Sequence, residues 1–456
     1  MQFPCGAWFQ QNGCYTAEDQ AWMMRKICMA ALFQGTRSSS AEIGIKYESN
    51  GFPIMSQSTP APWTQSKPTA LLILADGTII EGTGAGAVGI AEAEVCFNTA
   101  ITGYQEILTD PSYAGQIVTF TFPHIGNVGA NEEDVETLDM TGPTGVAGAI
   151  FKMPITNPSN YRSAIHFDDW LKSRNIIALC DIDTRALTAH IRESGLANAV
   201  IAHDPDGNFD IAALKQRAAK WAGLEGMDLA PSVTSKDTGQ WSQSSWIWDE
   251  GYHENKIHSH HIVAMDFGVK RNILRLFAGL DCKVTVVPAT ASADEILALN
   301  PDGIFLSNGP GDPAATGEYS VAEIRRLVDS GLPVFGICLG HQMLALALGA
   351  TTLKMHQGHH GANHPVKDHT TGKVEIVSMN HGFAVDSDSL PTGVEETHIS
   401  LFDGTNCGLR LTGKPVFSVQ HHPEASPGPQ DSHYLFRRFL NLIKQAKGEA
   451  LLEERA

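Results

Sequence analysis

The sequence is short of the features that mark several classes of protein. Lys and Arg number 32 against 50 Asp and Glu, which gives a formal net charge of −18 at pH 7. A nucleic-acid-binding protein needs a basic surface to neutralise phosphates, so this deficit argues against that class. No run reaches the roughly 18 apolar residues that a transmembrane helix requires. We therefore expect neither a nucleic-acid partner nor a membrane partner.

Cysteine is sparse as well, with 8 in 456 residues and no Cys-x-x-Cys pair. Disulfide frameworks and zinc ribbons need closer spacing, so we expect a reducing, cytoplasmic location in which most thiols are small apolar side chains. Four histidines, His356, His359, His360 and His364, have no orderly ligand spacing. We expect no metal site among them.

Nucleotide-binding loops are missing too. The chain contains no Gly-x-x-x-x-Gly-Lys-[Ser/Thr] sequence, so no Walker-type ATP site is visible. Residues 84–89 match the Gly-x-Gly-x-x-Gly dinucleotide fingerprint, but a hairpin pattern precedes them and no helical pattern follows. We interpret this run as a flexible glycine loop, and we expect no cofactor in this chain.

The length predicts two to three domains, and residues 1–66 differ from the rest. They are rich in Gln, Ser and Thr and have no sustained hydrophobic period, so we expect a poorly ordered extension. A start of translation at Met55 is a hypothesis that this lack of pattern suggests. N-terminal sequencing of the native protein that found earlier residues would refute it.

Short apolar runs separated by turn residues characterise residues 67–225, which we expect to form a β-rich domain. Its first two runs flank Asp76-Gly77, which is a strong hairpin signal. A helix is predicted at residues 184–193, stopped by Gly195. Residues 226–258 carry Pro, Ser, Gln, Lys and scattered Trp, and we interpret them as a linker.

Strands and helices alternate in residues 259–448. This order predicts an α/β domain with a mostly parallel central sheet covered on both faces. Ser292 and Glu295 have the spacing of a capping box. Antiparallel runs follow Gly349, and residues 449–456 are a C-terminal tail. The predicted strands are 262–267, 283–287, 303–306 and 333–337, and the predicted helices are 269–280, 292–299, 319–330 and 432–447.

The sharpest local feature is a buried strand that runs directly into Gly336-x-Cys338-x-Gly340, with a helix after it. This is the nucleophile-elbow pattern with Cys in place of Ser. The glycines let backbone pass close to backbone, and the helix N-terminus favours the thiolate form of Cys338. Taken alone, the segment also fits a structural cysteine beside two packing glycines.

The second feature is the strand end Pro415-Val-Phe-Ser-Val-Gln-His-His-Pro-Glu424. Side chains two apart on a strand share a face, so His422 and Glu424 point the same way, whereas His421 has the opposite parity. We expect Glu424 to hold one ring nitrogen of His422 and leave the other as the base for Cys338. Taken alone, the run also fits a surface strand end with a local ion pair.

Amide cleavage also needs hydrogen-bond donors for an oxyanion. The backbone N–H of Leu339 at the elbow supplies one. The loop at residues 307–313 leaves a neighbouring strand at the same sheet edge, and its Gly311 supplies a second. We therefore predict that Cys338, His422 and Glu424 form a catalytic triad.

With these segments in view, the chain resembles the triad-type, class I glutamine amidotransferases, and among them the small subunits of glutamine-dependent carbamoyl-phosphate synthetases. The amidotransferase half fits several members of the class. The closer likeness comes from the first domain and continues into the second, over about residues 67–447. One departure is His421, where the family commonly has an aromatic residue. The matching runs are 97–113 (FNTAITGYQEILTDPSY), 122–129 (FPHIGNVG), 183–188 (DTRALT), 358–366 (GHHGANHPV) and 380–383 (NHGF).

The resemblance implies both a substrate site and a partner. It implies a large subunit that binds ATP and Mg²⁺, receives ammonia through an internal channel and makes carbamoyl phosphate from bicarbonate, for arginine and pyrimidine synthesis. This chain would then release ammonia from L-glutamine. The glutamine contacts implied for this chain are Ser112, Gly309, Gly311, Leu339, Gln342, Asn380, Gly382 and Phe383.

Three other interpretations remain open from the sequence. A different triad amidotransferase, of the anthranilate or GMP synthesis type, is disfavoured by the β-rich first domain. A catalytically silent regulatory homologue is disfavoured by the intact Cys338, His422 and Glu424. A cysteine peptidase built on the same elbow is the third, and a glutaminase assay beside a peptide panel separates the three.

Overall fold

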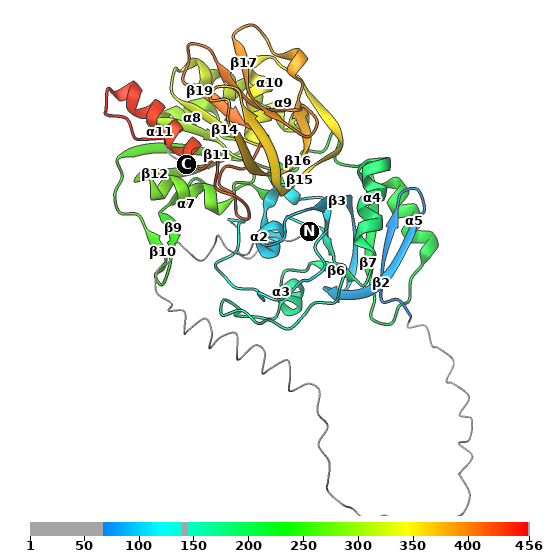
Figure 1. Cartoon of the computed structure of the whole chain (residues 1–456). Helices are drawn as coiled ribbons and strands as arrows, with labels where there is room; N and C mark the ends of the chain where they lie inside the picture. Colours follow the sequence, from blue (N-terminus) through cyan, green and yellow to red (C-terminus); the bar gives the residue numbers. More distant parts are fainter. Residues whose placement is uncertain (1–66, 139–144, 455–456) are drawn as a thin grey trace, which may run out of the picture. The chain divides into compact units, whose positions relative to one another are not determined.

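The computed structural model describes residues 67–138 and 145–454. The predicted extension at residues 1–66 and the Met55 hypothesis lie outside the described residues, as do the last two residues of the tail. A β-rich part, blue to green in Figure 1, is followed along the chain by an α/β part coloured green to red.

The β-rich part is a closed barrel with the strand order β1-β2-β6-β5-β4-β3-β7. Neighbours from β3 to β6 are parallel, and the remaining pairs are antiparallel. Because β1 pairs with both β2 and β7, closure leaves the barrel without an exposed strand edge. The strands are β1 Ala70–Leu74, β2 Ile79–Gly86, β3 Gly89–Asn98, β4 Gln116–Phe120, β5 Gly148–Ile150, β6 Ile177–Cys180 and β7 Ala197–His203.

Short helices cover this barrel. The predicted helix at 184–193 is confirmed as α4, because the Asp183 carboxylate caps it by accepting from two backbone N–H groups and Gly195 ends it with φ at +89°. The 3-10 helix η1 is capped in the same way by Asp110. The helices are α2 Tyr104–Thr109, η1 Pro111–Tyr113, α3 Phe167–Ser173, α4 Thr184–Ser194 and α5 Ile211–Lys220.

The segment that we expected to be a linker carries regular structure. It contains α6 (Ala230–Val233), β8 (Gly239–Trp241) and a separate hairpin of β9 (Gln243–Ile247) and β10 (Gly251–Glu254). Strand β8 pairs antiparallel with β12 and so extends the main sheet. Three residues are too few to show the alternation that reveals a strand in a sequence. The domain boundaries themselves stay a prediction.

The α/β part is built on a ten-stranded sheet in the order β16-β15-β17-β18-β19-β14-β13-β11-β12-β8. Its centre, from β19 to β12, is parallel as predicted, and antiparallel pairs flank it on both sides. The strands not yet given are β11 His260–Asp266, β12 Cys282–Pro288, β13 Gly303–Leu306, β14 Val334–Ile337, β15 Thr352–Asp368, β16 Val374–Val385, β17 Val394–Ser400, β18 Asn406–Leu411 and β19 Val416–Val419.

Helices cover both faces of this sheet (Figure 1). Alternation along the strands explains the two cores: Ile304 and Leu306 pack on the face of α8, α9 and α10, whereas Phe305 packs on the face of α7 and α11. The 3-10 helix η2 (Ser387–Ser389) lies between β16 and β17. The helices are α7 Arg271–Gly279, α8 Ala293–Ala298, α9 Pro313–Asp329, α10 Leu339–Leu348 and α11 Tyr434–Lys447.

Two local predictions have different outcomes. The capping box is confirmed, since the Ser292 and Glu295 side chains each bond to the other's backbone N–H. The predicted start of α9 at residue 319 is wrong. The helix begins six residues earlier at Pro313, because the Asp312 side chain caps it and Pro suits its first position.

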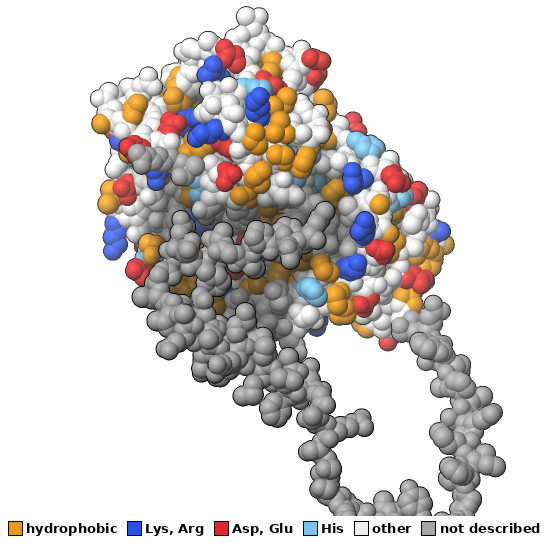
Figure 2. Space-filling view, in the orientation of Figure 1, with side chains coloured by type: hydrophobic (Ala, Val, Ile, Leu, Met, Phe, Trp, Pro, Cys, Tyr) orange, Lys and Arg blue, Asp and Glu red, His pale blue; other side chains and the backbone are white. Residues whose placement is uncertain are grey.

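The glycine run at residues 84–89 is also not a flexible loop. Gly84 and Gly86 belong to β2, and a β-carbon on Gly84 would lie 2.1 Å from the His203 ring. Close packing therefore explains the glycine. In the described ranges, no helix is long and apolar enough to cross a bilayer. On the face that Figure 2 shows, acidic and basic side chains are interspersed.

Candidate active site

The sulfur-bearing residue at the predicted elbow sits in a strained turn. Cys338 joins β14 to α10 with φ at +53° and ψ at −105°, an unusual backbone conformation for a non-glycine residue. A β-carbon on Gly336 would lie 2.6 Å from the carbonyl oxygen of Gly340, and one on Gly340 would lie 2.1 Å from that of Leu306. Both elbow glycines are therefore required by close backbone contacts.

The predicted contact between His422 and Glu424 is present, but not on a strand, because β19 ends at Val419 and both residues lie in the segment that follows it. Nδ1 of His422 and Oε1 of Glu424 are 2.7 Å apart, and both side chains are buried. The backbone N–H of His422 also donates to the carbonyl of Ser378 on β16 at 2.9 Å, which fixes the segment that follows β19. Because Nδ1 is taken by Glu424, Nε2 is the ring nitrogen left to exchange protons.

The protonation states follow from the neighbours. Burial alone would lower the pKa of His422, but Glu424 and Cys338 favour the imidazolium and raise that pKa to about 10. Burial would raise the pKa of Glu424, but Lys270 and His422 lower it to about 2. The site therefore holds a charged imidazolium beside a carboxylate and the sulfur of Cys338.

Two residues that the sequence analysis missed support the carboxylate. Nζ of Lys270 lies 2.9 Å from Oε1 of Glu424 and also donates to the carbonyl of Ala425 at 2.6 Å. Nδ2 of Asn272 donates to the carbonyl of Glu424 at 2.7 Å. Both residues follow β11 at the carboxyl edge of the sheet. Functional side chains gather at this edge in parallel sheets, so their position after a predicted strand could have marked them as site residues.

A pocket beside the sulfur brings most of the predicted substrate contacts together. The pocket is lined by residues of the barrel part, of the elbow and of β16. Leu339 is the exception, because its side chain is buried in the core on one face of the sheet. As the first residue of α10, Leu339 still has a backbone N–H without an intrahelical acceptor. The predicted residues that line the pocket with Cys338 are Ser112, Gly309, Gly311, Gln342, Asn380, Gly382 and Phe383.

Hydrogen bonds hold these residues in place. The Asp110 carboxylate accepts from the backbone N–H of Ser112 at 2.9 Å and from Nδ2 of Asn380 at 3.3 Å. Nε2 of Gln342 donates to the carbonyl of Phe383 at 2.8 Å. Asp110 thus bonds both to Ser112 beside the barrel and to Asn380 on β16, and so holds these two residues together in one wall of the pocket.

The two glycines of the loop after β13 permit close packing. A β-carbon on Gly309 would lie 2.2 Å from the carbonyl oxygen of Phe267. Gly311 has φ at +88°, and a β-carbon there would lie 2.7 Å from the carbonyl oxygen of Met227. The loop can therefore bring its backbone to the pocket only with glycine at these positions.

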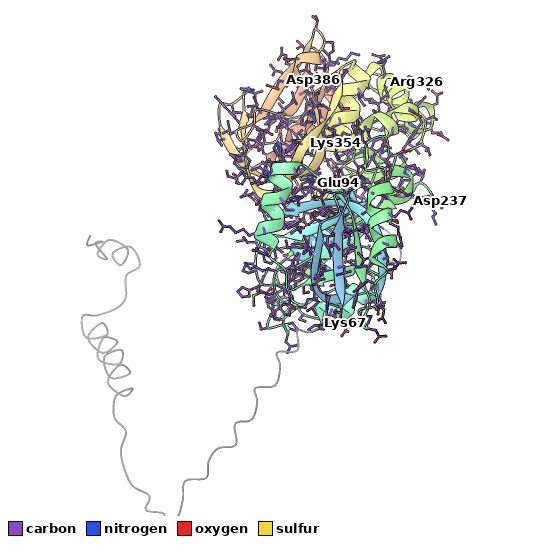
Figure 3. The ribbon with its side chains drawn as sticks, turned by 90° about the vertical axis from the view of Figure 1, so that its right-hand side faces the viewer. Lys67, Glu94, Asp237, Arg326, Lys354 and Asp386 are labelled. Atoms are coloured by element: carbon purple, nitrogen blue, oxygen red, sulfur yellow. The ribbon has the colours of Figure 1, made fainter. Side chains whose placement is uncertain are left out.

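The rim of the pocket carries a charged pair that the sequence did not suggest. Figure 3 shows Lys354 on β15 and Glu94 on β3 close together, and Nζ of Lys354 lies 2.8 Å from Oε2 of Glu94. The same Nζ is 4.7 Å from the centre of the Phe383 ring. Gln116 of β4 donates to the other oxygen of Glu94 at 3.0 Å. This network joins the rim to the barrel.

His421 is buried outside the pocket. Its ring packs against that of His398 with 5.6 Å between the centres, and burial lowers its pKa well below the usual range. The neutral ring is therefore part of the core behind the triad. Among residues 67–138 and 145–454, no three His, Cys, Asp or Glu side chains are grouped as metal ligands.

Comparisons with known proteins give the family of the chain. Residues 263–442 match the family model described as glutamine amidotransferase class-I, and residues 72–201 match that of the carbamoyl-phosphate synthase small chain, CPSase domain. The carbamoyl phosphate synthase small chain of Rhizobium meliloti (strain 1021) is 72% identical over 399 residues, which are 87% of this chain and 99% of the relative.

Two further relatives give the same result. The carbamoyl phosphate synthase small chains of Agrobacterium fabrum (strain C58 / ATCC 33970) and Mesorhizobium japonicum (strain LMG 29417 / CECT 9101 / MAFF 303099) are each 71% identical over 397 residues. These are 87% of this chain and 99% and 100% of the two relatives. The resemblance drawn from the residues is confirmed, and the chain belongs to the carbamoyl phosphate synthase small chain family, with a class-I glutamine amidotransferase domain.

Proposed function

We propose that this chain is the glutamine-hydrolysing subunit of a carbamoyl-phosphate synthase. Cys338 is the nucleophile, His422 the general acid and base, and Glu424 the group that orients the imidazole. The observation that carries this proposal is the 2.7 Å contact between His422 and Glu424 beside a cysteine held in a strained strand–helix turn. A nucleophile, a base and an orienting acid in one buried site suit acyl transfer.

The first half of the reaction forms a thioester. The Cys338 thiolate attacks the side-chain carbonyl carbon of glutamine, and the oxyanion accepts hydrogen bonds from the N–H groups of Leu339 and Gly311. As the intermediate collapses, the C–N bond breaks and His422 gives its proton to the departing nitrogen. Ammonia leaves, and a γ-glutamyl thioester remains on Cys338.

The second half regenerates the enzyme. Neutral His422 now takes a proton from water, and the resulting hydroxide attacks the thioester carbonyl. The C–S bond breaks, glutamate leaves, and the thiolate–imidazolium pair is restored. Glu424 stays ionised throughout because Lys270 and His422 keep its pKa at about 2.

The polar pocket suits the substrate. Glutamine is a small zwitterion, so its recognition requires hydroxyl, amide and backbone groups. We assign this role to Ser112, Gly309, Gly311, Leu339, Gln342, Asn380, Gly382 and Phe383. All but Leu339 line the pocket beside Cys338, which supports the assignment.

The synthesis of carbamoyl phosphate from the released ammonia belongs to a partner. Carbamoyl phosphate formation from bicarbonate needs ATP and Mg²⁺, and this sequence has no Walker-type motif. We therefore assign ATP, Mg²⁺ and bicarbonate to a large synthetase subunit that receives the ammonia, with arginine and pyrimidine synthesis as the use of the product. A cytoplasmic location is supported by the described cysteines, which are all free and buried.

Replacement of the nucleophile tests the proposal. Cys338→Ala should lower glutamate release from glutamine by about 10⁴-fold or more, while the complex still makes carbamoyl phosphate from free ammonia. Cys407→Ala, which removes another buried thiol that does not line the pocket, should retain hydrolysis. If Cys338→Ala released glutamate at the wild-type rate, the proposal would fail. A wild-type chain that bound the partner but never hydrolysed glutamine would indicate a silent homologue.

A further inference from the structure

A second region of the molecule is built for contact and plays no part in the mechanism above. Two cavities of about 410 and 440 Å³ lie between the β9–β10 hairpin and the barrel part. Both are lined by Arg162 and Trp246, so the two cavities share a wall. We call them together the hairpin groove.

Aromatic side chains stand exposed at the mouth of the hairpin groove. Tyr161 is 75% exposed and Trp248 is 66% exposed, and their ring centres are 6.0 Å apart. Trp246 packs edge-on against Trp248 at 5.8 Å, and the Arg162 guanidinium lies 5.5 Å from the centre of the Trp246 ring. Trp, Tyr and Arg are the residues most enriched where proteins bind one another tightly. Large apolar rings exposed together are uncommon on a surface without a partner.

The charges that line the groove favour a partner with cationic side chains. Its lining carries five carboxyl side chains and one cation, Arg162, which already pairs with Glu133 at 3.2 Å and with Asp134. Burial raises the pKa of Glu106 to about 8, and Asp134 adds to the rise. A cation that entered the groove would offset this excess of acidic groups, whereas nucleic acid or an anionic membrane would be repelled. The five carboxyl side chains are those of Glu106, Glu133, Asp134, Asp249 and Glu250.

A chain of contacts links the groove to the catalytic carboxylate. Tyr252 lines the groove, and the Arg275 guanidinium lies 3.8 Å from the centre of its ring. Arg275 and Glu136 are both buried, with 3.8 Å between their charged atoms. The Glu136 carboxylate accepts from the backbone N–H of Asn272 at 2.9 Å, and the Asn272 side chain donates to the carbonyl of Glu424. A partner in the groove would therefore touch a network that ends in the triad.

We propose that the hairpin groove is the docking surface for an Arg- or Lys-bearing segment of the large ATP-binding subunit. The aromatic faces of Tyr161 and Trp248 would stack on a guanidinium or an ammonium, and the carboxylates at the tip of the hairpin would pair with it. This inference rests on the proposed function, which requires such a subunit. Glutamine hydrolysis and docking are separate properties of the chain, so each can fail alone.

The test measures binding of the full-length chain to the purified large subunit by isothermal titration calorimetry. Trp248→Ala and Glu250→Lys should each raise Kd at least about tenfold and leave glutamine hydrolysis by the isolated chain unchanged. The matched controls, Phe402→Ala and Asp237→Lys, alter exposed residues outside the groove and should change Kd less than about twofold. Hydrogen exchange of residues 246–251 should slow in the complex.

Three outcomes would overturn the inference. Unchanged Kd and unchanged exchange in the groove variants would show that docking occurs elsewhere. Faster exchange at residues 246–251 in an isolated chain that lacks residues 1–54 would make the chain's own N-terminal segment the occupant. A wild-type chain that hydrolyses glutamine but forms no complex would refute the large subunit as the partner. Loss of hydrolysis with docking intact would refute only the catalytic proposal.

Discussion

The side-chain amide of Asn308 donates a hydrogen bond to the Ser112 hydroxyl across 2.9 Å, although 196 positions separate the two residues. Asn308 follows β13 in the α/β part, and Ser112 belongs to η1 beside the barrel. Both side chains are buried. The pocket beside Cys338 is therefore completed only when the two parts pack together, so substrate binding should depend on the contact between them.

Breaking this hydrogen bond should weaken glutamine binding more than chemistry. We expect Ser112→Ala and Asn308→Ala each to raise KM for glutamine by roughly 3- to 10-fold, because one buried hydrogen bond contributes about 1 kcal/mol. In a double-mutant cycle the two effects should be less than additive. Steady-state glutaminase kinetics measure this. Ser320→Ala, which removes a buried hydroxyl in α9 that bonds to Thr316, is the control and should leave KM unchanged.

The charge on His422 should depend on Cys338. The pKa of His422 is raised to about 10 by Glu424 and Cys338, so removing the sulfur in Cys338→Ala should bring it down. An NMR titration of labelled histidine measures the shift directly. An unchanged pKa in Cys338→Ala would contradict a close contact between the sulfur and the imidazolium.

The same shift has a consequence for stability. Because the folded pKa of His422 lies above its ordinary value of 6.5, the charged ring stabilises the fold fully below about pH 6.5, and this contribution is lost as pH rises through about 10. The difference in unfolding free energy between the wild type and His422→Gln should therefore shrink over that interval. Urea unfolding at several pH values measures it, and a difference that grew with pH would contradict the assignment.

Lys270 should matter far more than a surface lysine. It is buried and pairs with the buried Glu424 at 2.9 Å, so Lys270→Met removes one of the two cations that compensate this carboxylate and leaves only His422. We expect a loss of about 3–5 kcal/mol in unfolding free energy, a raised pKa of Glu424 and slower hydrolysis. Lys172→Met breaks an exposed pair with Asp168 and should cost at most about 1 kcal/mol. Equal losses in urea unfolding would contradict the role of Lys270.

The elbow glycine Gly340 should not tolerate a side chain. Alanine normally favours a helix over glycine by about 1 kcal/mol. At Gly340 the new β-carbon would lie 2.1 Å from the backbone oxygen of Leu306, so we expect a net loss of about 1–3 kcal/mol and a displaced Cys338. Gly317→Ala in α9 places its β-carbon 3.1 Å from a movable Val321 methyl and should be neutral or stabilising. Thermal unfolding of the two variants measures the contrast.

The candidate site was accessible to sequence reasoning where its geometry is local. The elbow glycines, the contact of His422 with Glu424 and the capping box at Ser292 each depend on a few neighbouring residues, and the structure has these arrangements. The glutamine contacts came instead from the family resemblance, because nothing within a few residues of Ser112 indicates that it lies opposite Asn308.

The sequence by itself determined the alternation of strands and helices, the turn that carries Cys338 and the family of the chain, because hydrophobic period, caps and glycine constraints act over short stretches. Only the tertiary structure decided that the β-rich part closes into a barrel, that β8 joins the sheet, and that Lys270 pairs with Glu424. Those features require segments up to hundreds of residues apart to meet, and the packing of the whole chain selects which of them do.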